Sequence, residues 1–227
     1  MKNQEEIKDV AELTMEYSEK LNQTLYDWII YHQKEIVFNQ CTYFGVPALK
    51  NPFDAWIYQE ILFEVKPDIV IEIGSAHGGS TLFLAHVLEL IGNGEVISID
   101  KDRSTYRVSH KCIIEVTGDS SSQKVFEEVN KRCAGKKVLI IHDGDHRYET
   151  VLHELHMYSP LVSVGSYFIV EDSIVDFFQN EEIGFEGKGP LYAIHEFVSE
   201  NRGFRIDDIR ERYVLTYNPF GFLIRIY

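Results

Sequence analysis

The sequence predicts an α/β fold: a doubly wound, mostly parallel, seven-stranded Rossmann-like sheet with an N-terminal helical extension and a C-terminal antiparallel hairpin. Three observations predict it. Short runs of branched apolar residues alternate with helical patterns, which is typical of parallel sheets covered on both faces. The run Asp68–Ser80 passes from a strand through glycines into an apolar helix. Closely spaced strand patterns flank Asn218-Pro219 near the end of the chain.

Hydrophobic periodicity and turn residues set the order of the elements. Residue Pro67 restricts Lys66, which we expect to be extended as it leads into the first strand. We predict one compact unit made of an extension or cover, 1–66, and a sheet domain, 67–227. The predicted helices are 7–32, 53–63, 81–91, 122–133, 148–158 and 191–200, and the predicted parallel strands are 69–73, 95–99, 113–116, 138–142 and 166–170. Three closely spaced strand patterns, 204–208, 213–217 and 222–226, follow them and would supply the C-terminal hairpin.

Composition excludes several classes of protein. The formal net charge of -14 disfavours nucleic acid and anionic membranes as partners, and it leaves carboxylates available for a hard metal ion or a cationic ligand. No apolar run reaches the length of a membrane span, and Met1–Asp9 has no apolar core of a signal peptide, so we expect a cytoplasmic protein. The three cysteines form no C-x-x-C pair, and we expect them to be reduced.

The glycine-bearing turn after the first long strand indicates a cofactor site. A dinucleotide fingerprint needs glycine at its second position, where this chain has Ala76. The pattern Glu72-x-Gly74-x-x-x-Gly78 instead resembles the turn of class I S-adenosylmethionine-dependent methyltransferases. The alternative is a tight turn that binds no ligand. Ligands of open α/β sheets lie beyond the carboxyl ends of the strands, so an acidic residue ending the next strand, Asp100, is placed for a ribose or is merely a solvated strand end.

A second group of polar residues follows the fourth and fifth predicted strands. It comprises His142-Asp143-Gly-Asp145-His146 and Glu171-Asp172. If the two strands are neighbours, three carboxylates converge, and oxygen ligands at that density suit Mg²⁺ or Ca²⁺ rather than zinc. His146 would then lie close enough to a metal-bound hydroxyl to act as its general base. The alternative is a set of solvated caps and turn residues.

Taken together, these motifs resemble the rhamnosyl O-methyltransferase and cephalosporin hydroxylase family of the class I methyltransferase superfamily. The resemblance covers most of the chain from about Asn51. Five blocks carry it in order: Pro52–Glu60, Glu72–Ser80, Asp143–His146, Gly165–Asp172, and Gly189-Pro190 followed by Leu215–Pro219. The chain has no 2-His-1-carboxylate iron motif, so the resemblance implies methyl transfer rather than hydroxylation.

The resemblance also implies roles for individual residues. It implies His146 as the catalytic base, with Asp145 either a supporting residue or the metal ligand in place of Asp143. The implied metal ligands for Mg²⁺ or another hard divalent cation are Asp143, Glu171 and Asp172. The implied S-adenosylmethionine contacts are Glu72, Gly74, Ser75, Gly78 and Ser80 near the methionine end, Asp100 at the ribose, Asp119 and Ser120 near adenine, and Asp143.

We therefore predict an S-adenosylmethionine- and Mg²⁺-dependent O-methyltransferase for a hydroxyl of a sugar or glycosylated natural product. Two alternatives stay open: a metal-dependent hydrolase, because Gly144-Asp145-His146 resembles a metallophosphatase motif, and a non-catalytic S-adenosylmethionine-binding scaffold. We expect a homo-oligomer, and the N-terminal helix is placed either to cover the site or to pair subunits. Neither the number of subunits nor the acceptor follows from the sequence. The segment 173–189 is predicted to be a substrate lid or a surface loop.

Overall fold

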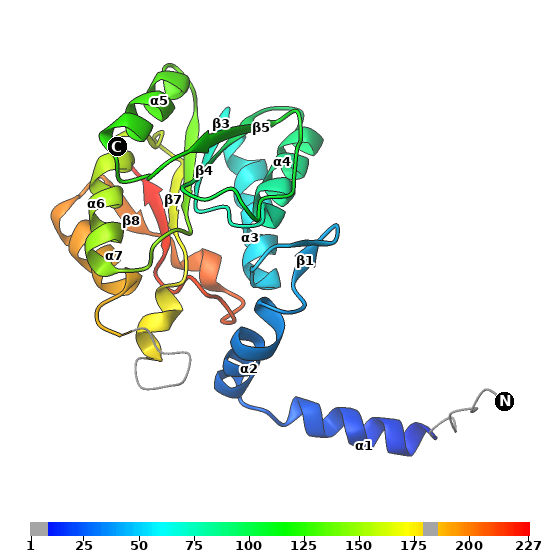
Figure 1. Cartoon of the computed structure of the whole chain (residues 1–227). Helices are drawn as coiled ribbons and strands as arrows, with labels where there is room; N and C mark the ends of the chain where they lie inside the picture. The colour runs from blue at the N-terminus through cyan, green and yellow to red at the C-terminus, as the bar shows by residue number, and fades with distance from the viewer. Residues whose placement is uncertain (1–8, 179–185) are drawn as a thin grey trace.

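A seven-stranded mixed sheet forms the centre of the molecule (Figure 1). This computed structural model describes residues 9–178 and 186–227. The parallel strands are β3 (Ile69–Ile73), β4 (Glu95–Asp100), β5 (Ile113–Thr117), β6 (Val138–His142) and β7 (Tyr167–Val170), and the antiparallel strands are β8 (Phe204–Ile206) and β9 (Phe222–Arg225). Their order across the sheet is β5-β4-β3-β6-β7-β9-β8, which confirms the predicted fold class.

The order of the strands reverses at β3, which pairs with β4 on one side and β6 on the other. In this register Ile73 lies opposite both Ile99 and His142, so the three strands end at the same level. Such a switch point opens a crevice at the carboxyl edge of a parallel sheet. The residues that follow β3, β4 and β6 therefore meet at one edge.

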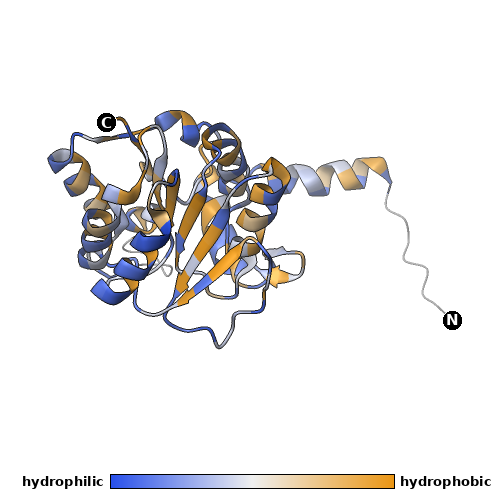
Figure 2. Cartoon of the chain, turned by 90° about the horizontal axis from the view of Figure 1, so that it is seen from above, coloured by the Kyte–Doolittle hydropathy of each residue, from blue (hydrophilic) through white to orange (hydrophobic). Residues whose placement is uncertain are grey.

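Helices cover both faces of the sheet. Residues Ile69, Ile71 and Ile73 pack with α5 (Gln123–Cys133), α6 (Tyr148–Tyr158) and α7 (Pro190–Glu200), whereas Val70 packs with α3 (Pro52–Val65) and α4 (Gly79–Ile91). Figure 2 shows the apolar strands between helices of mixed polarity. Because both faces are buried, the central strands β3, β6 and β7 are apolar at most positions instead of alternating apolar and polar residues. Helix α3 precedes residue 67 but belongs to this core.

The N-terminal region differs from the single helix predicted at 7–32, whose first two residues lie outside the described part. It forms α1 (Val10–Leu21), α2 (Leu25–Tyr31) and a π-helix, η1 (His32–Val37). The break occurs because Thr24 and Asp27 form a capping box that starts α2 anew. None of the residues of α1 is buried, and the helix extends away from the sheet in Figure 1.

Three further predictions about local structure were incomplete or wrong. A small hairpin of β1 (Thr42–Tyr43) and β2 (Val46–Pro47) precedes α3 and was not predicted. Lys66 is left-handed, with φ 49° and ψ 60°, rather than extended, because its N–H closes α3 on the carbonyl of Leu62. The predicted strand 213–217 is absent from the described sheet.

Within the described residues, no helix is both long and apolar enough to span a membrane.

The segment 215–218 is irregular because a buried carboxylate organises it instead of a strand partner. Asp54 of α3 is 3% exposed and accepts hydrogen bonds from Thr216 Oγ1 (2.5 Å) and the Tyr217 N–H (2.8 Å). Thr216 Oγ1 in turn accepts from the Asn218 N–H, and Asn218 Nδ2 donates to Tyr58 of α3. Side chains of α3 thus fix this segment beside the carboxyl edge.

We predict that Asp54 makes stability fall as pH rises. Burial raises the pKa of its carboxyl to about 7, against the lowering effect of Thr216 and Tyr217. Between the ordinary pKa of about 4 and this value, the folded protein binds more protons than the unfolded chain. Relative to Asp54→Asn, the wild-type free energy of unfolding should therefore decrease from pH 5 to pH 7, by at most about 1.4 kcal/mol per pH unit.

Urea denaturation at several pH values measures this difference. The same substitution at the exposed Asp208 controls for the loss of one carboxylate. Parallel pH profiles for the wild type and Asp54→Asn would show that the buried carboxyl is not protonated in this range.

Candidate active site

A cavity of about 520 Å³ opens at the carboxyl edge of the sheet, a volume typical of small-molecule sites, which span about 300–1,000 Å³. Its floor is formed by the residues that follow β3, β4, β5 and β6. Residues of η1 and of the segment before α3 form part of its wall. The lining includes Gln33, Val37, Phe38, Leu49, Gly74, Ser75, Ser80, Asp100, Gly118, Asp119, Ser120, Asp143, Asp145, His146, Glu154, Asp172 and Tyr217.

The turn after β3 depends on glycine for close backbone approach. Gly74 has φ +85°, and a Cβ at this position would overlap the backbone carbonyl of Asp143. Gly78 has φ +91° and caps α4, and a Cβ there would lie 2.5 Å from Val108 Cγ2. Only glycine satisfies both the left-handed backbone and the contact. The turn is therefore pressed directly against the end of β6.

Glu72 lies beneath this turn rather than in the cavity. Its side chain is fully buried and accepts hydrogen bonds from Ser80 Oγ (2.5 Å) and Thr81 Oγ1, both in the first turn of α4. Burial raises the pKa of the Glu72 carboxyl, and the two hydroxyls oppose that rise. Of the residues predicted around the methionine end, Gly74, Ser75 and Ser80 line the cavity, whereas Glu72 and Gly78 shape the wall behind it.

Asp100 and Asp119 are held by backbone groups at the ends of β4 and β5. Asp100 Oδ2 accepts from the N–H groups of Ser75 (3.0 Å) and Ala76 (2.8 Å), so this carboxylate also fixes the glycine turn. Burial raises the pKa of Asp100, but these backbone donors and that of Asp102 outweigh it and hold the pKa below its ordinary value. Asp119 accepts from Ser121. Both carboxylates line the cavity.

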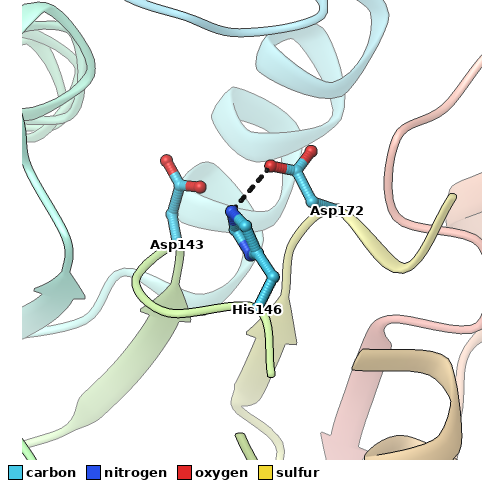
Figure 3. Close-up of side chains that lie close together, drawn as sticks. All are labelled: Asp143, His146 and Asp172. Atoms are coloured by element: carbon cyan, nitrogen blue, oxygen red, sulfur yellow. Dashed lines mark ion pairs between the residues drawn. The ribbon is translucent and has the colours of Figure 1, made fainter. Parts of the chain in front are cut away.

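An acidic group of three carboxylates, Asp143, Glu171 and Asp172, follows β6 and β7, and Figure 3 shows Asp143 and Asp172 with His146 beside them. Asp143, His146 and Asp172 each offer a ligand atom within 4.8 Å of the others. His146 Nε2 lies 3.3 Å from Asp172 Oδ2. Glu171, the third predicted ligand, is 4% exposed and lies next to Asp172. The predicted convergence of three carboxylates is therefore present, with Glu171 outside the closest group.

A lysine that the sequence analysis missed joins this group. Lys50 is 8% exposed, and its Nζ donates to Asp143 Oδ2 and to Glu171 Oε2, the latter at 2.7 Å. Burial lowers the pKa of Lys50, but the charges of Asp143 and Glu171 outweigh it, and the net shift is upward. For Glu171, burial has the opposite effect and raises the pKa well above its ordinary value. The charge of Asp143 adds to this rise, and Lys50 opposes it.

The donor atoms of this group fit a hard divalent cation. Glu171 Oε1 and His146 Nδ1 are buried and have no hydrogen-bond partner among the described residues. Burial raises the pKa of Asp172, against the effect of His146, so a metal-free site holds its negative charge unfavourably. Carboxylate oxygens are the ligands that Mg²⁺ and Ca²⁺ prefer. The residues therefore suit an ion that would use the oxygens left free.

Asp145, the alternative metal ligand, has a different partner. Both of its oxygens accept hydrogen bonds from Arg147. The Arg147 guanidinium lowers the pKa of Asp145 to about 2. The structure therefore favours Asp143 as the member of the acidic group and gives Asp145 a local ion pair.

Other functional side chains were also missed. Arg103 donates to Ser75 Oγ (2.8 Å) and to the carbonyl of Val116, which ties the glycine turn to β5. His142 Nε2 and Glu154 Oε2 lie 2.6 Å apart in a fully buried pair that joins β6 to α6. Lys50 lies two residues before the block Pro52–Glu60, and this position is the signal in the sequence that could have pointed to it.

The predicted lid, 173–189, falls partly outside the description, because residues 179–185 are not described. Residues Ser173–Phe177 form a 3₁₀-helix, η3. Asp176 accepts hydrogen bonds from the N–H groups of Gly189 (2.7 Å) and Leu191 (2.8 Å) at the start of α7. These contacts fix both ends of the described part of the segment.

Comparison with known proteins gives concordant matches. Residues 35–226 match the family model described as Rhamnosyl O-methyltransferase/CmcI. The rhamnosyl O-methyltransferase of Mycobacterium leprae (strain TN) is 35% identical over 203 residues, which cover 83% of this chain and 85% of that protein. The enzyme of the same name from Mycobacterium tuberculosis (strain ATCC 25618 / H37Rv) is 30% identical and covers 95% of this chain and 89% of its own length.

Among solved structures, the one described as cmcI-D160 Mg-SAM superposes with a TM-score of 0.66 and is 22% identical. The match covers 84% of this chain and 78% of that chain. A structure described as CmcI-N160 apo-structure gives a TM-score of 0.64 at 23% identity, with 82% and 76% of the two chains covered. Both share the fold described above.

The contact between Gly74 and Asp143 predicts a sharp difference between two glycine substitutions. Gly135 also has a left-handed backbone, φ +71°, but nothing lies within 4 Å of a Cβ built there. Gly135→Ala should cost only backbone strain, about 1–2 kcal/mol. Gly74→Ala adds steric overlap with Asp143 and should lower the free energy of unfolding by about 2 kcal/mol more.

Urea denaturation tests the stability difference, and calorimetric titration with S-adenosylhomocysteine tests the cavity. We expect Gly74→Ala to weaken binding and Gly135→Ala to leave it unchanged. Equal stability and equal affinity in the two variants would show that the turn tolerates a side chain.

Proposed function

The chain belongs to the rhamnosyl O-methyltransferase/CmcI family, and from this premise we propose that it is an S-adenosylmethionine- and Mg²⁺-dependent O-methyltransferase for a hydroxyl of a sugar or glycosylated natural product. One observation carries the proposal. The glycine turn after β3 and the acidic group after β6 and β7 line the same cavity and touch through Gly74 and Asp143. A methyl donor and a cation-bound hydroxyl would therefore meet in one place.

The residues divide into two sets in this proposal. Gly74, Ser75, Ser80, Asp100, Asp119 and Ser120 would hold S-adenosylmethionine, with Glu72 and Gly78 shaping the turn and Asp143 reaching both sets. Asp143 and Asp172, with the free oxygen of Glu171, would hold Mg²⁺. When bound, S-adenosylmethionine supplies the methyl group, and Mg²⁺ supplies positive charge that lowers the pKa of the acceptor hydroxyl.

His146 is the proposed general base. Mg²⁺ prefers oxygen to nitrogen ligands, so the imidazole is left for proton transfer. Its Nε2 faces Asp143 and Asp172 in Figure 3 and would accept the proton of the acceptor hydroxyl. Asp172, 3.3 Å from Nε2, would then stabilise the imidazolium. The remaining effect comes from holding the acceptor in place.

The acceptor would lie against the N-terminal wall of the cavity. Gln33 and Val37 of η1 and Tyr217 line this side. The side-chain oxygen of Gln33 is buried without a hydrogen-bond partner among the described residues, so it would suit a hydroxyl of a sugar. The named activity of the relatives, rhamnosyl O-methylation, makes a rhamnosyl group the first acceptor to test.

Three further expectations are kept as proposals. The exposed apolar residues Val10, Leu13, Tyr17 and Leu21 of α1 support a homo-oligomer. Within the predicted cover, 1–66, the part from η1 to Lys50 would cover the site, since η1 lines the cavity and Lys50 reaches the acidic group, whereas α1 extends away from the sheet and α3 belongs to its core. Cytoplasmic location rests on the sequence alone. Neither alternative function gains support, because a hydrolase would leave the glycine turn without a role and a scaffold would leave the acidic group without one.

We expect methyl transfer to require the divalent cation and Asp143. Incubation with EDTA should abolish transfer of labelled methyl from S-adenosylmethionine to rhamnosides such as 4-nitrophenyl α-L-rhamnoside, and added Mg²⁺ should restore it. Asp143→Asn should lower kcat at least about 100-fold, because it weakens the metal site. Asp145→Asn is the matched control, since Asp145 pairs with Arg147. Full activity in EDTA, or equal effects of the two variants, would contradict the metal assignment.

His146→Ala should lower kcat by about 100- to 10,000-fold through loss of the general base. The affinity for S-adenosylhomocysteine, measured by calorimetry, should stay at the wild-type value. His153→Ala, at an exposed position on α6, is the control. The assignment of the base is wrong if His146→Ala retains the wild-type kcat.

A further inference from the structure

Building on the proposed function, we infer that Lys50 is a built-in counter-ion of the metal site: its ammonium neutralises Asp143 and Glu171 before the divalent cation binds and limits how tightly that cation is held. Lysine is not a metal ligand, so this role concerns charge rather than coordination. Lys50 is thus a positioning residue in the proposed reaction.

The contacts of Lys50 divide the oxygens of the acidic group into two sets. Its Nζ takes one oxygen of each carboxylate, Asp143 Oδ2 and Glu171 Oε2. The other oxygen of Glu171 is buried without a partner among the described residues. Lys50 therefore orients two carboxylates from one side and leaves Glu171 Oε1 available to the divalent metal ion.

The backbone of Lys50 is fixed on both sides. Its carbonyl accepts a hydrogen bond from Cys41 Sγ at 3.0 Å. The next residue, Asn51, caps α3 through Phe53 N–H and donates from Nδ2 to the carbonyl of Leu215. Leu49 on the other side packs against the apolar cluster of Ile29, Val37, Phe178 and Tyr217. A lysine held in this way is part of the site and not a mobile surface charge.

Charge arithmetic gives two consequences. Asp143, Glu171 and Asp172 carry up to three negative charges in a poorly solvated space, and such carboxylates repel one another strongly. The ammonium offsets one of them, so the protein can fold without metal. The same ammonium repels an incoming divalent cation, so the site binds that cation less tightly than three carboxylates alone would. Cation sites are tuned by the charge of their surroundings in this way.

Titration of the metal-free protein with Mg²⁺ by calorimetry, and with Mn²⁺ by electron paramagnetic resonance, tests the inference. Lys50→Met removes the charge and should tighten binding by about tenfold or more. Its metal-free melting temperature should fall, and Mg²⁺ should raise it more than in the wild type. Lys50→Arg keeps the charge and should bind Mg²⁺ with near wild-type affinity. Lys101→Met removes an exposed charge from the same cavity and is the control.

Unchanged or weaker metal binding in Lys50→Met would overturn the inference, because Lys50 would then only orient the ligands. If Lys50→Met does not fold, Lys50→Gln replaces it with the same expected outcomes. A wild-type protein that unfolds in EDTA would also contradict the role, since the ammonium would not substitute for the metal. A wild type that binds neither ion overturns both this inference and the metal part of the proposed function. A wild-type protein that binds the metal ion but not S-adenosylhomocysteine would contradict the proposed function and leave the role of Lys50 intact.

Discussion

Repulsion among three carboxylates at one edge of the sheet is the constraint on which the rest of the site depends. Parallel pairing of β6 and β7 brings Asp143, Glu171 and Asp172 together, because both strands end at the same edge. The fold meets this repulsion with nearby positive charge and donors. Lys50 bridges two of the carboxylates, His146 approaches the third, and the Asp172 N–H donates to Asn218. The acidic group persists because elements from both ends of the chain surround it.

The glycine turn after β3 and the acidic group behave as one structural unit. The Asp143 N–H donates to the carbonyl of Ile73 at 2.7 Å, and the Gly74 N–H donates to the carbonyl of Ile99 at 2.9 Å. The turn lies so close to the carbonyl of Asp143 that a side chain at position 74 would not fit between them. A shift of either part would therefore move the other. In the proposed reaction the methyl donor and the acceptor must be held close together, and a rigid link between the turn and the acidic group would serve that requirement.

The sequence was sufficient to predict the sheet and most of the cavity floor. Buried parallel strands are apolar along their length, and the residues after them are fixed by topology, which is why Asp100, Asp119 and Asp143 were found. The role of Lys50 could not be predicted from the sequence, because its partners Asp143 and Glu171 lie 93 and 121 residues away along the chain. The His142–Glu154 pair could not be predicted either, because its two residues belong to different elements, β6 and α6. The strand predicted at 213–217 failed because Asp54 offers its backbone a buried acceptor, and this contact spans 163 residues.

Specificity in this fold must come from what surrounds the sheet, because the sheet itself supports many activities. The N-terminal region supplies much of that surrounding. A π-helix at η1 turns Gln33 and Val37 toward the cavity, and π-helical turns commonly occur at functional sites. Lys50 lies just before α3 and contacts the acidic group, and Asp54 in the first turn of α3 holds the segment around Tyr217. Residues before the first strand of the sheet thus set both the charge beside the proposed metal and the wall that an acceptor would meet, while the strands keep the glycine turn in a fixed place.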